Sequence, residues 1–260
     1  MRRRSAPLEV FNLSALDLFA SALGAFIVLA VVALPYFPKV YSDQPAEPRE
    51  VIDLVIVLDS TGSMGAEIAE IREDLKVVAD LLGLVSETPA LGIIDFEDAA
   101  CPSNGIRSHA LVTLSPSSLR SLQSFADSIE PGSVAPDGTN CNTSNGEALS
   151  EGLQAATQLA WRPEASRHLI IVVTDEGAHP SSRDAGVRAA ESFAARHALP
   201  AGGTWRIFCG GKLAQSSTGA SLDFTQDCRT MAERGGGEFV SLDSDELSFI
   251  AFVMRAVLSD

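Results

Sequence analysis

Oxygen-bearing side chains follow the abrupt end of an apolar run in VIVLDSTGSMG, residues 55–65. Asp59, Thr61 and Ser63 occupy every second position, and in an extended chain this spacing points their side chains to the same side. A second apolar run, IIVVTDEG, ends on Asp175. Two carboxylates and two hydroxyls form an all-oxygen ligand set, which suits a hard divalent cation such as Mg²⁺. We therefore expect these four side chains to form a cation site.

The elements that must position this site follow from an alternation of apolar runs and amphipathic segments that begins at residue 51. Continuous valine and isoleucine runs separated by helices predict an α/β domain with a doubly wound, mostly parallel sheet. In such sheets ligands bind beyond the carboxyl ends of the strands, so Asp59 and Asp175 are expected to share one crevice. A closing helix is expected near the C-terminus, with Ser244 as its N-cap. The expected strands are residues 51–59, 90–97, 110–114, 168–175, 204–210 and 237–242.

The sequence DSTGS, residues 59–63, matches the D-x-[ST]-x-S signature of von Willebrand factor A (vWA) domains, and IIVVTDEG resembles that family's strand-end aspartate. The family more often has glycine directly after this aspartate, where this chain has Glu176. The resemblance covers roughly residues 50–260 and implies a Rossmann-like vWA fold with a metal-ion-dependent adhesion site (MIDAS). It implies that Thr61, Ser63 and a loop threonine ligate the cation, and that Asp59 and Asp175 act largely through water.

The loop threonine implied by the resemblance lies in PDGTNCNTSNGEAL, residues 136–149. The spacing to the Ala-Leu pair at the end of this segment favours Thr143, whereas a preceding glycine favours Thr139 as the alternative. The implied cofactor is Mg²⁺, with Mn²⁺ and Ca²⁺ also open. The implied partner is a protein or envelope ligand whose carboxylate completes the coordination of the metal. In the competing interpretation the site serves only to stabilise its loops.

The segment Leu18–Phe37 contains twenty consecutive residues without a charge, which is long enough to cross a bilayer as a helix. Three arginines at residues 2–4 precede it and only Lys39 follows soon after, so the N-terminus is expected to be cytoplasmic and the C-terminal domain exported. A cleaved signal peptide fits less well, because its apolar core is shorter and no clear cleavage site follows. The three arginines also make a buried core helix a poor fit.

A membrane-spanning segment of this orientation predicts a single-pass protein of the bacterial inner membrane with a periplasmic or extracellular C-terminal domain. We expect a cytoplasmic N-terminus, a transmembrane helix, a proline-containing linker and an exported vWA domain. Their expected bounds are 1–12, 13–37, 38–50 and 51–260.

Asp17 gives the apolar segment a feature that a plain anchor does not need, because ionisable residues within membranes are costly. At helical spacing Asp17 shares a face with small residues, including Ala20 and Gly24. Residues 15–29, ALDLFASALGAFIVL, resemble the single transmembrane helix of the MotB/ExbD/TolR families, although they depart from it at the residue before the aspartate. The resemblance implies that Asp17 carries protons and that two copies of the chain sit within a MotA/ExbB/TolQ-like polytopic protein. Alternatively, Asp17 snorkels to the headgroups in a simple tether.

Four cysteines occur in the exported part: Cys101, Cys141, Cys209 and Cys228. An even number in an oxidising compartment predicts two disulfides, for which three connectivities exist, and free buried thiols are the alternative. The chain has no CxxC pair, which argues against a zinc site. We put forward the pairs Cys101–Cys141, bracing the rim of the cation site, and Cys209–Cys228, tying a strand end to the next helix, as hypotheses.

The charge of the chain and the absence of a catalytic motif exclude two classes of function. The net charge of −15 argues against nucleic acid as a partner, and no nucleophile–base constellation supports an enzyme. The sequence therefore favours a single-span subunit of a proton-driven inner-membrane motor or stator-like complex, whose periplasmic vWA domain binds a ligand through a divalent metal. The alternative is a membrane-tethered, metal-dependent adhesion or scaffold protein with no ion-translocating role.

Overall fold

The structure, a computed structural model, describes residues 49–101, 105–132, 146–198, 203–211, 224–242 and 248–259. The chain divides into two compact units, Met1–Pro48 and Arg49–Asp260, and the fold below is that of the second unit. The expected transmembrane segment and Asp17 lie outside the described residues. Within the ranges just given, no helix is both long enough and apolar enough to cross a membrane.

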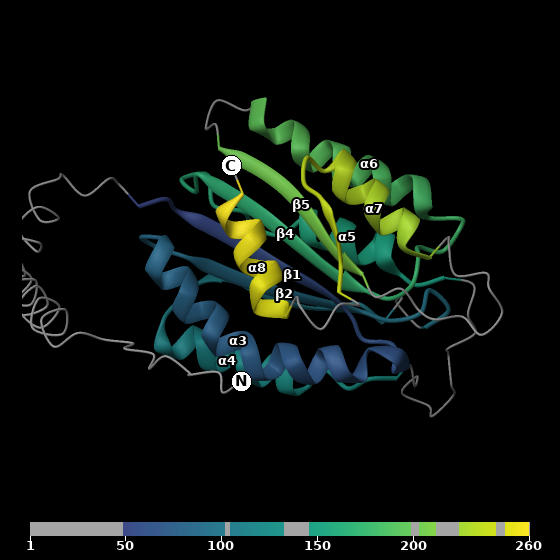
Figure 1. Ribbon diagram of the computed structural model, residues 1–260, viewed down its shortest axis with the longest axis horizontal. Helices are drawn as coiled ribbons and strands as arrows, with labels where there is room; N and C mark the ends of the chain where they lie inside the picture. Colours follow the sequence, from purple (N-terminus) through teal and green to yellow (C-terminus); the bar gives the residue numbers. More distant parts are fainter. Residues whose placement is uncertain are drawn as a thin grey trace, which may run out of the picture. The chain divides into compact units, whose positions relative to one another are not determined.

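A six-stranded sheet forms the centre of the second unit, in the order β3-β2-β1-β4-β5-β6 (Figure 1). Neighbouring strands run parallel except β2 and β3, which are antiparallel. The predicted α/β fold with a mostly parallel sheet is therefore confirmed. The strands are β1 (Ile52–Asp59), β2 (Ala90–Phe96), β3 (Arg107–Thr113), β4 (Arg167–Thr174), β5 (Thr204–Gly211) and β6 (Phe239–Ser241).

Helices cover both faces of this sheet, as the doubly wound pattern predicts (Figure 1). One face packs against α3 (Gly65–Val85), α4 (Pro116–Asp127) and α8 (Phe249–Leu258). The opposite face packs against α5 (Leu149–Thr157), α6 (Arg183–Ala194) and α7 (Phe224–Arg234). Two short 3-10 helices, η2 (Gly62–Met64) and η4 (Ala195–Ala198), lie at the start of α3 and the end of α6.

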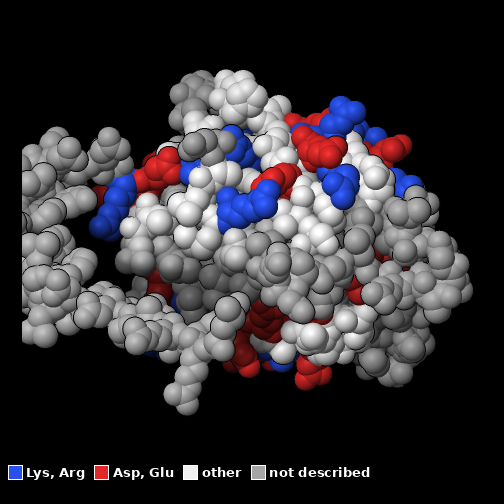
Figure 2. All heavy atoms as spheres, viewed as in Figure 1, with Lys and Arg blue, Asp and Glu red and all other residues white. Residues whose placement is uncertain are grey.

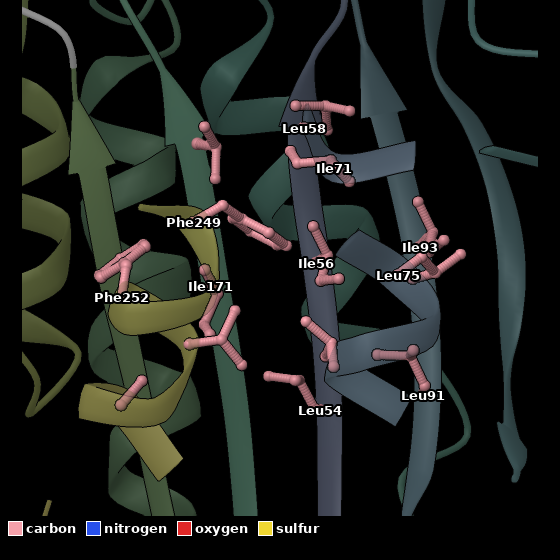
Figure 3. Close-up of a cluster of buried hydrophobic side chains, with 14 of the residues drawn as sticks. Leu54, Ile56, Leu58, Ile71, Leu75, Leu91, Ile93, Ile171, Phe249 and Phe252 are labelled. Carbon is pink, nitrogen blue, oxygen red and sulfur yellow. The ribbon is translucent and has the colours of Figure 1, made fainter. Parts of the chain in front are cut away.

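The central strand β1 is buried along its whole length, because alternate side chains enter the two cores. Figure 3 shows Leu54, Ile56 and Leu58 of β1 on the face that α3 and α8 cover. Val55 and Val57 point into the other core. Each fully buried aliphatic side chain of this size contributes about 1.5–3 kcal/mol. This packing fixes β1, and with it the position of the aspartate at its carboxyl end.

Most strand ends lie within two residues of the expected bounds, but the third strand and the last helix start elsewhere. The third strand was expected at residues 110–114 but begins at Arg107, because an edge strand tolerates polar, exposed residues that break the apolar pattern. The last helix begins at Phe249 and its N-cap is Ser248, whose hydroxyl accepts a hydrogen bond from Ala251 N. Ser244, the expected cap, lies outside the described residues. The amide of Phe249 also donates to a Glu70 carboxylate at 2.9 Å, which fixes the helix start from α3.

The predicted Cys209–Cys228 disulfide is confirmed and joins β5 to α7. Cys101 is also disulfide-bonded. Its predicted partner, Cys141, lies outside the described residues, so the Cys101–Cys141 pairing stays a prediction.

Acidic and basic side chains are intermixed on the face shown in Figure 2, above α6 and α7. Arg234 of α7 pairs with Glu191 of α6 at 3.2 Å. Arg255 of α8 donates to the carboxylate of Glu238 from Nε at 2.5 Å and from Nη2 at 2.9 Å. These arginines are therefore paired with acidic neighbours.

A buried ion pair ties the amino end of β1 to the segment that precedes β4. Asp53 is fully buried, and its carboxylate accepts hydrogen bonds from Arg162 Nε at 2.7 Å and from the Arg162 backbone amide at 2.9 Å. The Arg162 guanidinium also donates to Thr88 O at 2.7 Å, next to β2. One arginine therefore holds together the starts of three adjacent strands.

Replacing Arg162 with methionine should lower the free energy of unfolding by about 3–5 kcal/mol, because a buried carboxylate loses its partner. Urea unfolding followed by circular dichroism measures this change. The control is Lys76→Met, which breaks the exposed Lys76–Asp80 pair, whose side chains are 63% and 64% exposed. That pair contributes at most about 0.5 kcal/mol, and an equally small loss for Arg162→Met would contradict the structural role.

Candidate metal centre

The carboxyl ends of β1 and β4 lie side by side, because the two strands are parallel and Leu58 pairs with Val173. Asp59 ends β1, and Thr174 and Asp175 follow at the end of β4. The chain leaves β1 through a short loop that enters η2 and then α3, so Thr61 and Ser63 remain at the same edge of the sheet. The register thus brings together the four described residues that the sequence predicts as ligands.

Three hydrogen bonds orient the carboxylate of Asp59, which is fully buried. One oxygen, Oδ1, accepts from the Thr61 backbone amide at 2.9 Å and from the Thr61 hydroxyl at 2.7 Å. The other, Oδ2, accepts from the hydroxyl of Thr174 at 2.7 Å. Thr174 was not among the predicted site residues, because a threonine within an apolar strand carries no ligand signal of its own.

Ser63 connects the first loop to the second aspartate. Its hydroxyl lies 3.4 Å from the hydroxyl of Thr61 and is also hydrogen-bonded to Asp175. Asp175, Ser63, Thr61 and Asp59 therefore form one continuous series of polar contacts. Asp59 and Thr61 are buried, whereas Ser63 is exposed and Asp175 half-buried, so the series runs from the protein interior to the surface.

The electrostatics of this cluster favour a bound cation. Burial raises the pKa of Asp59 to about 7, against the opposing effect of its hydrogen bonds from Thr61 and Thr174 and with added repulsion from Asp175. Burial also raises the pKa of Asp175, and the hydrogen bond from the Ser63 hydroxyl opposes that rise. A positive ion near the two carboxylates would stabilise their charged forms.

Glu147 is the main residue of this region that the sequence analysis missed. Its side chain is buried, and burial raises its pKa to about 10, with further repulsion from Asp59, Glu176 and Asp98. Its Oε2 atom has no hydrogen-bond partner among the described residues, while the carboxyl group is hydrogen-bonded to that of Glu176. Glu147 is thus a buried acidic side chain that pairs with no basic residue of the described part of the chain, and it lies close enough to Asp59 for their charges to repel.

A glycine places Glu147 at this position. Gly146 has a φ of 108°, and a Cβ added there would lie 2.8 Å from the backbone of His179. The close approach lets the amide of Glu147 donate to Gly177 O at 2.9 Å and its carbonyl accept from His179 N at 3.0 Å. The Gly-Glu pair directly before a helix is the signal in the sequence that could have pointed to Glu147.

The donor set fits a hard divalent cation in kind, since it consists of two carboxylates and two hydroxyls. Across the described ranges, no three His, Cys, Asp or Glu side chains form a group that could hold a metal ion. The predicted centre has only two acidic ligands and takes the rest from hydroxyls. The loop threonine candidates, Thr143 and Thr139, lie outside the described residues.

Solved structures with a similar fold include three bacterial proteins. The conserved hypothetical protein BatB from Bacteroides thetaiotaomicron is 20% identical, with 80% of this chain and 100% of that chain covered and a TM-score of 0.49. An aerotolerance-related membrane protein from Bacteroides fragilis NCTC 9343 is 17% identical, with 79% and 98% covered and a TM-score of 0.49. The pilus adhesin SpaC from Lactobacillus rhamnosus GG, in its open conformation, is 13% identical, with 80% of this chain but only 30% of that chain covered and a TM-score of 0.54.

Of these three, the SpaC structure has a TM-score above 0.5, and at 13% identity it indicates the fold alone. No curated protein matches the sequence. The family comparison goes further, because the model of the von Willebrand factor type A domain matches residues 53–235, which is more than half of the chain. The chain belongs to the von Willebrand factor A domain family.

Proposed function

We propose that this chain is a divalent-cation-dependent binding protein, and that its vWA domain grips a carboxylate of a protein or envelope ligand. The cation is Mg²⁺, Mn²⁺ or Ca²⁺ and is held by Asp59, Thr61, Ser63 and Asp175 together with Thr143 or Thr139. The observation that carries this proposal is the continuous series of contacts from buried Asp59 through Thr61 and exposed Ser63 to half-buried Asp175. When bound, the metal supplies a positive charge that an incoming carboxylate can coordinate.

In the proposed site, each of the described residues has a separate role. Asp59 orients the Thr61 hydroxyl by accepting its hydrogen bond, and Thr174 fixes the far side of the same carboxylate. Ser63 and Asp175 lie nearer the surface, where a partner can reach them. The described residues of the site contain no nucleophile paired with a histidine or lysine base, and we propose binding rather than catalysis. A site used only for loop stability is the competing possibility, and metal titration separates the two.

Without divalent metal, raising the pH from 5 to 8 should lower the melting temperature of the full-length protein. The pKa of Asp59 is raised to about 7 in the folded state, above its ordinary value near 3.8, so the folded form binds the extra proton and loses this stabilisation as the pH rises through 7. Mg²⁺ should remove most of the loss. Thermal unfolding with EDTA or with Mg²⁺ measures both effects, and Asp59→Asn should flatten the pH dependence. An unchanged profile in that variant would contradict the assignment.

Replacing Ser63 with alanine should weaken Mg²⁺ binding at least tenfold, because a ligand hydroxyl is lost from an exposed position that the fold does not need. Isothermal titration calorimetry with Mg²⁺ alone measures the affinity. Ser192→Ala, at an exposed position of α6, serves as the control and should bind normally. Thr143→Ala and Thr139→Ala, titrated in parallel, identify the loop ligand. Equal affinity for the Ser63 and Ser192 variants would refute the site.

We further propose that residues 18–37 span the bacterial inner membrane, with the N-terminus in the cytoplasm and the vWA domain in the periplasm or outside the cell. In this proposal Asp17 carries protons and a dimer of this chain assembles with a MotA/ExbB/TolQ-like polytopic protein. The support is the sequence pattern alone: three arginines before an uncharged stretch, and an aspartate followed by small residues. The alternative is a membrane-tethered adhesion or scaffold protein without ion flux.

Purification of the tagged full-length chain from native membranes should recover a multi-span partner in excess over two copies of this chain, as judged by native mass spectrometry. Reconstituted in vesicles with a pH-sensitive dye, that complex should conduct protons. Asp17→Asn should abolish proton flux without lowering the amount of complex, while Asp43→Asn in the linker should leave it unchanged. Recovery of this chain without a multi-span partner would favour the tethered adhesion protein.

A further inference from the structure

The loop that carries three of the proposed ligands is anchored from outside the metal centre. Ser60 lies between Asp59 and Thr61, and its amide and hydroxyl both donate to Phe96 O, at 2.8 and 3.0 Å. Its hydroxyl also lies 3.4 Å from Asp95 Oδ2, and its carbonyl accepts from Gly132 N at 3.0 Å. The position of this loop is therefore set by the carboxyl end of β2 and by the segment after α4.

Asp95, at that end of β2, has a fully buried carboxylate. Its Oδ2 atom accepts from Arg107 Nε at 3.0 Å and from Arg107 Nη2 at 2.7 Å. The same oxygen is the one near Ser60, so Arg107 and Ser60 converge on a single atom. Burial raises the pKa of Asp95, and the hydrogen bonds and charge of Arg107 oppose that rise.

Arg107 has a third contact, from Nη1 to Ser128 O at 3.1 Å, directly after α4. One guanidinium group at the start of β3 thus contacts both the end of α4 and Oδ2 of Asp95 in β2, which is the atom that lies near the Ser60 hydroxyl. A planar guanidinium makes these contacts simultaneously because its donors are fixed in a fork, whereas a lysine ammonium on its flexible stem cannot.

We propose that Arg107 is a positioning residue for the metal centre: through Asp95 and Ser60 it fixes the loop of Asp59, Thr61 and Ser63, and so sets the affinity for the cation. This inference rests on the proposed metal-binding function. Its physical basis is that a cation selects preorganised ligands, and that partners beyond the ligands typically change metal affinity by about 10–100-fold.

Positioning and simple charge make opposite predictions at Arg107. If Arg107 acted only through its charge, it would repel the bound cation, and removing that charge would strengthen cation binding. Loosening the ligand loop weakens binding instead. The sign of the change therefore identifies the mechanism, independently of its size.

The test is calorimetric titration of the full-length chain in detergent with Mg²⁺. Arg107→Met should weaken binding about tenfold, and Arg107→Lys, which keeps the charge, should also weaken it. The matched control is Arg72→Met, because Arg72 Nε donates to Ala126 O at 3.0 Å, near the same end of α4. This variant also loses a charge and an arginine–carbonyl hydrogen bond, and its affinity should stay at the wild-type value.

A double-mutant cycle with Ser60→Ala tests the path. If Arg107 acts through Ser60, Arg107→Met should change affinity much less in the Ser60→Ala background than in the wild type. Thermal unfolding in EDTA checks that each variant is folded, and Arg107→Lys carries the test if the methionine variant is not. Tighter or unchanged binding in the Arg107 variants, or additive effects in the cycle, would overturn the inference. Absence of Mg²⁺ binding in the wild type would refute the proposed function itself, and this inference with it.

Discussion

The fold places three aspartates of its central strands where water does not reach, and how each is neutralised determines the architecture around it. Asp53, Asp59 and Asp95 are all fully buried. A buried carboxylate is costly unless a cation or a set of hydrogen bonds compensates it. Asp53 pairs with Arg162, and Asp95 pairs with Arg107. Asp59 has only an amide and two hydroxyls among the described residues.

This difference separates the two aspartates that pair with arginine from Asp59, which we propose as a metal ligand. The arginine partners of Asp53 and Asp95 tie strands, loops and α4 together, so those two carboxylates serve stability and position. Asp59 sits at the carboxyl edge of the sheet, where a doubly wound fold opens to ligands. Among the described residues no basic side chain pairs with it, so a proton or an added cation would complete its charge compensation. In the proposed metal centre, the carboxylate that is costly to bury without metal would be the one that favours metal binding.

The sequence predicted most of this arrangement, and its omissions have physical causes. Apolar runs reveal buried parallel strands directly, and the D-x-[ST]-x-S pattern after one of them pointed to Asp59, Thr61 and Ser63. The sequence analysis did not identify Glu147, Thr174 or Arg107, because their roles depend on contacts between elements far apart in the chain. Arg107 acts 47 residues away from Ser60, across an antiparallel edge strand whose polar start carries no apolar pattern. The local pattern of apolar and polar residues carries no information about such long-range contacts between side chains.

The placement of β1 also gives the two proposed activities a physical connection. The linker expected at residues 38–50 contains three prolines, and its first eleven residues lie outside the described part of the chain. It leads directly into β1, the strand that ends on Asp59. Because β1 is paired on both sides with parallel strands, a load applied at its start would be resisted by two ladders of hydrogen bonds in shear. In the membrane-tethered protein that we propose, a pull between the membrane and a ligand held at the metal would therefore act along a strand that is hydrogen-bonded on both sides.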